Sequence, residues 1–117
     1  MEKRSMSSAD EVRAFPKGKL EIIHAGGITF GRATLEPGWK WSECLKPFVK
    51  TENCEAQHTQ YHVWGRLMVR MDDGTEQLFG PGDVAVIPPG HDSWVVGNEP
   101  VIVIDVTGMT YFADLLE

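Results

Sequence analysis

The sequence predicts an all-β protein built from short antiparallel strands. Its apolar runs are short and rich in valine and isoleucine, and turn signals separate them at intervals of about 8–12 residues. The 12 glycines and 7 prolines suit many turns, and 42% hydrophobic residues suffice for a core. A length of 117 residues is that of one domain, so we expect a single sandwich or small barrel.

Charge and composition exclude several classes of partner. The formal net charge of −6 argues against nucleic acid or an anionic membrane surface, because both attract clustered lysine and arginine. No apolar run approaches about 18 residues, so we expect no membrane span. The N-terminus lacks the apolar segment of a signal peptide, which predicts a cytoplasmic protein. Cys44 and Cys54 are then expected to be reduced thiols or ligands rather than a structural disulfide.

Turn residues set the limits of the predicted strands. Within one domain over 1–117, residues 1–16 are predicted to form an N-terminal extension with a single helical turn at 8–13, and the core spans about 20–106. Residues 72–75 (Asp-Asp-Gly-Thr) carry the Asp-Gly signal of a hairpin. The predicted strands cover residues 20–24, 28–36, 39–46, 54–64, 66–71, 76–79, 84–87, 93–96 and 101–106.

A rigid bend is predicted just before His91. The apolar run 84–87 has strand propensity, and residues 88–90 (Pro-Pro-Gly) end it, because proline lacks an N–H and glycine tolerates positive φ. A fixed bend between two strands can aim polar side chains, here His91 and Asp92, into a site. The alternative is an ordinary corner between strands.

The strand predicted at 54–64 carries the most informative pattern. Its period of two places Cys54, His58 and His62 on one face, with Gln60 between the histidines. Residues four apart on a strand lie roughly 13 Å apart, so both histidines cannot bind one metal ion unless the strand bends or bulges. One could bind a metal while the other lines a pocket. The alternative is a polar, solvated face.

The two cysteines offer a second possible contribution to a site. If the hairpin after 39–46 is centred near residue 49, Cys44 lies opposite Cys54, with Cβ atoms roughly 4.5–5.5 Å apart. Two thiols at that distance could share a metal ion with His58, or oxidise together. The alternative is that both are small buried thiols that pack as hydrophobic groups.

Two segments of the sequence resemble motifs of the cupin superfamily. Residues 82–90, with Gly-Asp followed by Pro-Pro-Gly, look like the start of the second cupin motif, G-x5-P-x-G-x2-H-x3-N. Residues 62–65, His-Val-Trp-Gly, look like the end of the first motif. The resemblance covers about 37–106 and implies an antiparallel double-stranded β-helix, the small jelly-roll barrel of cupins. It also implies frequent dimers, and a metal ion held by three histidines and one glutamate.

The usual cupin ligands are not at their usual positions in this chain. The position of the motif glutamate holds His58, and the histidine of the second motif is replaced by Ser93, two residues after His91. The resemblance therefore implies either a site that has lost its metal or one rebuilt from His58 and His91 with a further ligand, which is Cys44, Cys54, His62 or Glu43. Imidazole and thiolate would suit one divalent transition metal per chain, Zn, Ni, Fe or Mn.

The sequence thus predicts a cupin that handles a small molecule at a non-standard metal site. His62 and Glu43 are the predicted acid–base residues, and the pocket is predicted to include Gln60, Ser93, Trp41 and Trp94. A homodimer is expected, because strand pairing between subunits would hide a sheet edge. The alternative function is a non-catalytic ligand-binding or sensor cupin without a metal. A third possibility is a purely structural barrel filled by its own side chains.

Overall fold

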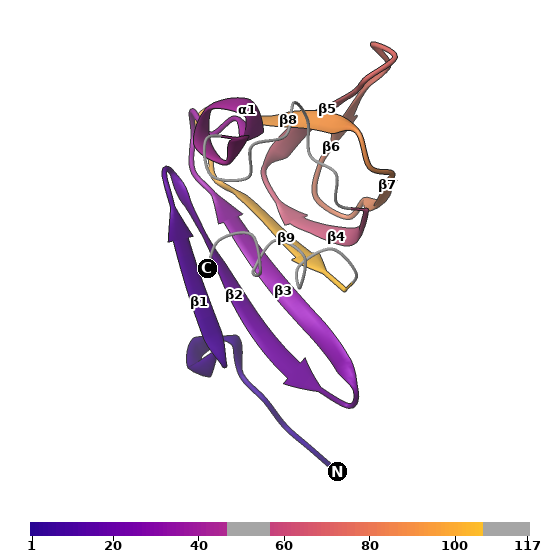
Figure 1. The fold of residues 1–117 in the computed structure, drawn as a ribbon. Coiled ribbons are helices and arrows are strands. Elements are labelled where there is room, and N and C mark those ends of the chain that lie inside the picture. Colours follow the sequence, from indigo (N-terminus) through magenta and orange to yellow (C-terminus); the bar gives the residue numbers. More distant parts are fainter. Residues whose placement is uncertain (47–56, 107–117) are drawn as a thin grey trace.

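The computed structural model describes residues 1–46 and 57–106. Nine strands form two antiparallel sheets in the described residues, one with the order β1-β2-β3-β9-β4-β7 and one with the order β6-β5-β8 (Figure 1). The elements are η1 (Met6–Ser8), β1 (Glu11–Phe15), β2 (Gly18–Ala25), β3 (Ile28–Leu35), α1 (Trp41–Cys44), β4 (His58–Trp64), β5 (Arg66–Met71), β6 (Glu76–Phe79), β7 (Val84–Ile87), β8 (His91–Val96) and β9 (Val101–Asp105).

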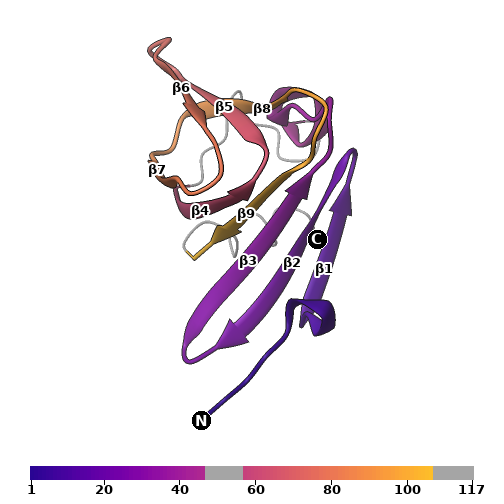
Figure 2. The ribbon, with the colours of Figure 1, turned by 180° about the vertical axis from the view of Figure 1, so that it is seen from behind.

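The predicted fold class is confirmed. The chain is all-β with a cupin-like jelly-roll arrangement, although hydrogen bonds do not close the two sheets into a barrel in the described residues. Figure 2 shows the long strands β1, β2 and β3 on one side and the curved strands β4 to β8 on the other, with β9 between them. The core lies where the faces of the two sheets meet, and it draws side chains from both.

Two predicted elements are wrong. Residues 11–15 form strand β1, which pairs with β2, where a helical turn was predicted. Residues 41–44 form the short helix α1 where a strand was predicted over 39–46. Helix spacing explains the burial better than alternation, because Trp41, Cys44 and Leu45 are buried at i, i+3 and i+4 while Glu43 is exposed.

A buried carboxylate fixes the start of this helix. Asp92 Oδ1 accepts hydrogen bonds from the backbone N–H groups of Ser42 (3.1 Å) and Ser93 (2.9 Å). The first bond satisfies a helix N–H that has no partner within the helix. Asp92 therefore links α1 to β8. The segment that follows the bend at residues 88–90 thus stabilises the fold as well as carrying His91.

Gly65 joins the two sheets at the corner between β4 and β5. Its φ is +78°, and a Cβ placed there would lie 2.2 Å from the carbonyl oxygen of Pro100. Neither the backbone conformation nor the space therefore allows a side chain.

We expect Gly65→Ala to destabilise the protein by about 2–4 kcal/mol, the sum of conformational strain and a displaced backbone. Gly74→Ala is the matched control, because Gly74 also has a positive φ of 89° but nothing within 4 Å of the added Cβ. Its cost should be about 1 kcal/mol. Urea unfolding measures both variants, and equal losses would show that the approach of Pro100 is unimportant.

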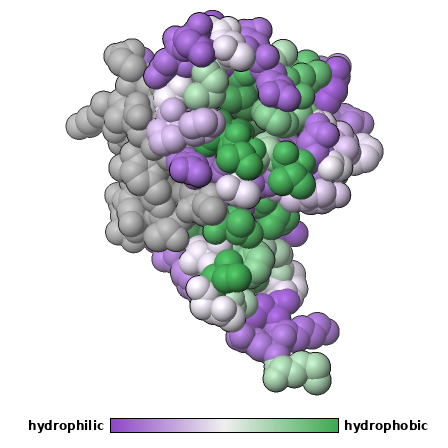
Figure 3. All heavy atoms as spheres, turned by 90° about the vertical axis from the view of Figure 1, so that its right-hand side faces the viewer, coloured by the Kyte–Doolittle hydropathy of each residue, from purple (hydrophilic) through white to green (hydrophobic). Residues whose placement is uncertain are grey.

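The outer face of the six-stranded sheet is apolar at its β4–β7 end. Tyr61 and Val84 are cross-strand partners, and Val86 lies on the same exposed face. Figure 3 shows apolar side chains gathered on the side of the molecule where β7 lies. Among the helices in the described residues, none is long and apolar enough to cross a membrane.

Candidate ligand pocket

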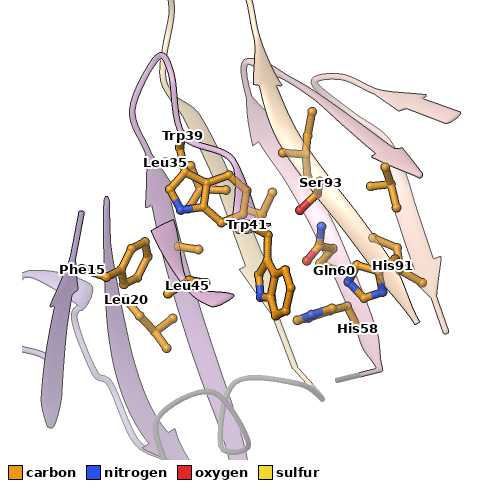
Figure 4. Close-up of a pocket in the computed structure, with 15 residues that line it drawn as sticks. Phe15, Leu20, Leu35, Trp39, Trp41, Leu45, His58, Gln60, His91 and Ser93 are labelled. Carbon is orange, nitrogen blue, oxygen red and sulfur yellow. The ribbon is translucent and has the colours of Figure 1, made fainter. Parts of the chain in front are cut away.

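A pocket lies between the two sheets and has a largely apolar lining (Figure 4). It contains about 590 Å³ of space free of protein atoms, part of which is open solvent. Its apolar lining consists of Phe15, Leu20, Ala33, Leu35, Trp39, Trp41, Leu45, Leu67, Val69, Ile87 and Val103. Its polar lining consists of His58, Gln60, His91 and Ser93. An apolar pocket with a few convergent polar groups is typical of small-molecule sites.

The polar residues come from one strand of each sheet. His58 and Gln60 are alternate residues of β4, and His91 and Ser93 are alternate residues of β8, so each pair points to one face of its sheet. The burial of His58, Gln60 and His62 confirms the alternation predicted for β4. The rings of His58 and His91 meet edge to face, with centroids 5.4 Å apart. The structure thus brings together His58 and His91, which are 33 positions apart in the sequence.

Sequence reasoning missed a buried carboxylate behind His58. Asp105 on β9 is fully buried, and its Oδ2 lies 2.5 Å from His58 Nδ1. An ionised carboxylate can only accept, so Nδ1–H of His58 donates, and the carboxylate orients the ring. An imidazole oriented in this way can take up a proton from a bound molecule through Nε2. The available signal was an acidic residue inside the apolar run 101–106.

His91 is held as a neutral imidazole. Its Nδ1 lies 2.8 Å from the carbonyl oxygen of Pro88, which can only accept a hydrogen bond, so Nδ1 carries the proton. Burial lowers the pKa of His91 to about 4, although the bond to Pro88 opposes this change. The bend over residues 88–90 therefore sets the tautomer of His91 and leaves a lone pair on Nε2.

His62 is fully buried but does not line the pocket. Its ring stacks on Phe79, with centroids 5.2 Å apart, and burial lowers its pKa. Its Nε2 lies 3.0 Å from Nε2 of Gln60, which can only donate. The proton of His62 is therefore on Nδ1, which has no hydrogen-bond partner among the described residues. His62 is bonded to the lining residue Gln60 but is not itself a lining residue, and its acid–base role stays a prediction.

The structure places the other predicted site residues in different surroundings. Trp41 lines the pocket as predicted. Glu43 is exposed on α1 and is not a lining residue, and Cys44 packs in the hydrophobic core. Cys54 lies outside the described residues, so its predicted pairing with Cys44 stays a prediction.

Trp94 belongs to a separate cluster rather than to the pocket lining. The ammonium of Lys40 lies 5.2 Å from the centroid of its ring, and the guanidinium of Arg70 lies 5.8 Å from it. These are cation–π contacts at the surface of the three-stranded sheet. Trp94 is not among the residues that line the pocket here, and its predicted place in the site stays a prediction.

The described residues do not by themselves assemble the metal centre that the resemblance implies. No three His, Cys, Asp or Glu side chains converge on a common point in residues 1–46 and 57–106. His58 and His91 supply two imidazoles, and Cys44 packs in the core away from the pocket lining. A complete set of three histidines and one glutamate is therefore not assembled by the described residues.

Neither the protein-family models nor the curated proteins give a match. Solved structures do match. A protein of unknown function from Rhizobium leguminosarum bv. viciae 3841 is 23% identical, with a TM-score of 0.66. The match covers 92% of this chain and 96% of that chain. The polyketide cyclase RemF from Streptomyces resistomycificus is 14% identical, with a TM-score of 0.65. The match covers 92% of this chain and 79% of that chain.

A variant of oxalate decarboxylase from Bacillus subtilis is 23% identical, with TM-score 0.55, and 85% of this chain matches 28% of that longer chain. All three similarities are below 25% identity, so they support the fold and not an activity. Together with the two antiparallel sheets, they place this chain among proteins with a cupin-like fold.

Proposed function

We propose that this chain is a small-molecule-handling cupin whose pocket binds a mainly apolar ligand by one polar end. The observation that carries the proposal is the convergence of His58, Gln60, His91 and Ser93 at one end of an otherwise apolar pocket. Burial of apolar ligand surface would supply most of the affinity, at about 25 cal/mol per Å². The polar end would orient the ligand, and the pair of His58 and Asp105 gives the site a group for proton transfer.

Filling the pocket is expected to weaken binding. Ala33 lines the pocket from β3, and Ala33→Leu adds volume where a ligand would lie. Small aromatic probes should bind this variant about tenfold or more weakly than the unchanged protein, a loss of about 1.4 kcal/mol or more. Fluorescence of Trp39 and Trp41, which both line the pocket, reports the binding.

Val84→Leu is the control for this experiment, because Val84 is 68% exposed on the outer face of β7. It should leave probe affinity unchanged. Equal affinity of the Ala33→Leu variant and the unchanged protein, with both folded by circular dichroism, would place the ligand elsewhere.

One transition metal ion per chain stays a prediction from the resemblance. His58 and His91 would contribute to it, and an ion with an open coordination position would supply Lewis-acid chemistry. Elemental analysis of protein purified without chelators and then dialysed tests it. About one Zn, Ni, Fe or Mn per chain, lost in His58→Ala, would support the metal, and no uptake after incubation with these ions would remove it.

A homodimer is also proposed, and the apolar outer face supports it. Tyr61, Val84 and Val86 are exposed at the end of the sheet where β7 forms the edge, and none of them is charged. A second copy could cover this surface symmetrically. Light scattering tests this, and a dimer that persists in Val86→Lys would show that another surface is used.

A further inference from the structure

We infer that the polar end of the pocket recognises a neutral hydroxyl group on its ligand, rather than a carboxylate or an ammonium. This inference rests on the proposed function, since it names the chemical class that the pocket takes. The hydrogen bonds behind the pocket carry it, because they fix which lining atoms can accept a hydrogen bond.

His91 presents an acceptor. Its Nδ1–H donates to the carbonyl oxygen of Pro88, and the residue is 3% exposed. Burial of an imidazole favours its neutral form. The remaining nitrogen, Nε2, therefore carries a lone pair that can accept a ligand O–H.

Gln60 presents a second acceptor. Its Nε2 donates to His62, which leaves the carbonyl Oε1 as the atom of the amide with unused acceptor capacity. Figure 4 shows Gln60 pointing from β4 into the space between Trp41 and His91. The stacking of His62 on Phe79 holds the partner of the amide in place. The bond between Gln60 and the buried His62 thus leaves the carbonyl oxygen of Gln60 as an acceptor in the pocket.

Binding of a carboxylate at this end of the pocket would be unfavourable, because no cationic side chain lines it among the described residues. None of the described lining residues is a lysine or an arginine, and the carboxyl group of Asp105 lies directly behind His58. A buried anion without a cationic partner is unfavourable. The indole N–H groups of Trp39 and Trp41 have no hydrogen-bond partner among the described residues, but they are neutral donors and do not supply the missing positive charge.

Binding of an ammonium group would be unfavourable because the rest of the lining is apolar. A cation would lose its hydration against apolar side chains, and Asp105 already bonds to His58. Ser93 accepts or donates and does not discriminate between ligands. A hydroxyl can donate its single proton to His91 or to Gln60 at a lower cost of desolvation than either ion, and a phenol adds the apolar body that the pocket favours.

The test compares five single-ring probes that differ in one group: 4-methylphenol, p-xylene, 4-methylanisole, 4-methylbenzoate and 4-methylbenzylamine. Tryptophan fluorescence titration with the full chain at pH 7.5 gives each affinity. We expect 4-methylphenol to bind about fivefold more tightly than p-xylene and 4-methylanisole, as one net hydrogen bond gives. The benzoate and the amine should bind more weakly than p-xylene.

Two variants assign the preference to its residues. His91→Phe keeps a ring and removes the acceptor, and it should bring the ratio of 4-methylphenol to 4-methylanisole affinity close to one. His24→Phe is the matched control, because His24 is an exposed residue of β2 outside the pocket lining. It should leave the ratio unchanged.

The outcomes separate the inference from the proposed function. Equal affinities for all five probes, or a preference for the benzoate or the amine, would overturn the inference while the pocket stands as a binding site. Binding of none of the probes would overturn both. A preference for 4-methylphenol that survives in folded His91→Phe would exclude His91 as the acceptor.

Discussion

Lowering the pH from about 6.5 to about 4 is expected to destabilise this protein by about 3 kcal/mol through His91 alone. The pKa of His91 is about 4 in the folded chain, against a usual value of 6.5. Between these values the unfolded chain binds the proton and the folded chain does not, so unfolding takes up a proton and acid favours it. The difference corresponds to the stated loss at 1.36 kcal/mol per unit of pKa. Stability is therefore full above about pH 6.5 and falls toward pH 4.

Urea unfolding at several pH values between 7.5 and 4 measures this effect. His91→Gln should flatten most of the slope, and the remainder should come from His62, whose pKa is also lowered by burial. The exposed carboxylates Asp10 and Asp73 have lowered pKa values, through hydrogen bonds from Arg4 and Thr75 respectively. Their contributions are lost at lower pH, as they become protonated. An unchanged slope in folded His91→Gln would show that His91 is charged in the native protein.

Removing the carboxyl group of Asp105 is expected to cost about 3–5 kcal/mol. Asp105 is fully buried and bonds to the buried imidazole of His58, and loss of one member of such a pair leaves the other in an apolar interior. Asp105→Ala should show the full loss. Asp105→Asn should lose less, because its amide oxygen can still accept from Nδ1–H of His58.

A double variant isolates the interaction between these two residues. His58→Leu combined with Asp105→Leu should be less destabilised than the sum of the single variants, because neither polar group then stays without its partner. Asp73→Ala, at an exposed turn, is the control and should cost under about 1 kcal/mol. Additive losses in the double variant would show that the two side chains act independently.

Local signals were sufficient to predict most of the fold. The Asp-Gly hairpin at residues 72–75 and the alternation over His58, Gln60 and His62 both appear as predicted. The error over residues 39–46 arose because both a strand period and a helix period fit this short segment. The bond of Asp92 to the backbone N–H of Ser42 favours the helix, and it joins residues 50 positions apart in the sequence.

Local signals also predicted part of the candidate site. Spacing along one strand predicted that His58 and Gln60 share a face, and the bend over residues 88–90 indicated His91. The partner of His58 was not predictable, because Asp105 lies 47 positions away and reaches it only through the pairing of β4 with β9. Long-range strand order decides which polar residues meet, and the sequence contains no local signal for it.

The separation of the two sheets has a kinetic consequence for any molecule bound between them. His58 and Gln60 belong to one sheet, and His91 and Ser93 belong to the other, so an occupant of the pocket contacts both sheets at once. We expect motion of the two sheets relative to each other to admit and release it. Residence time should follow the frequency of that opening, and an occupied pocket should slow hydrogen–deuterium exchange in β4 and β8 together.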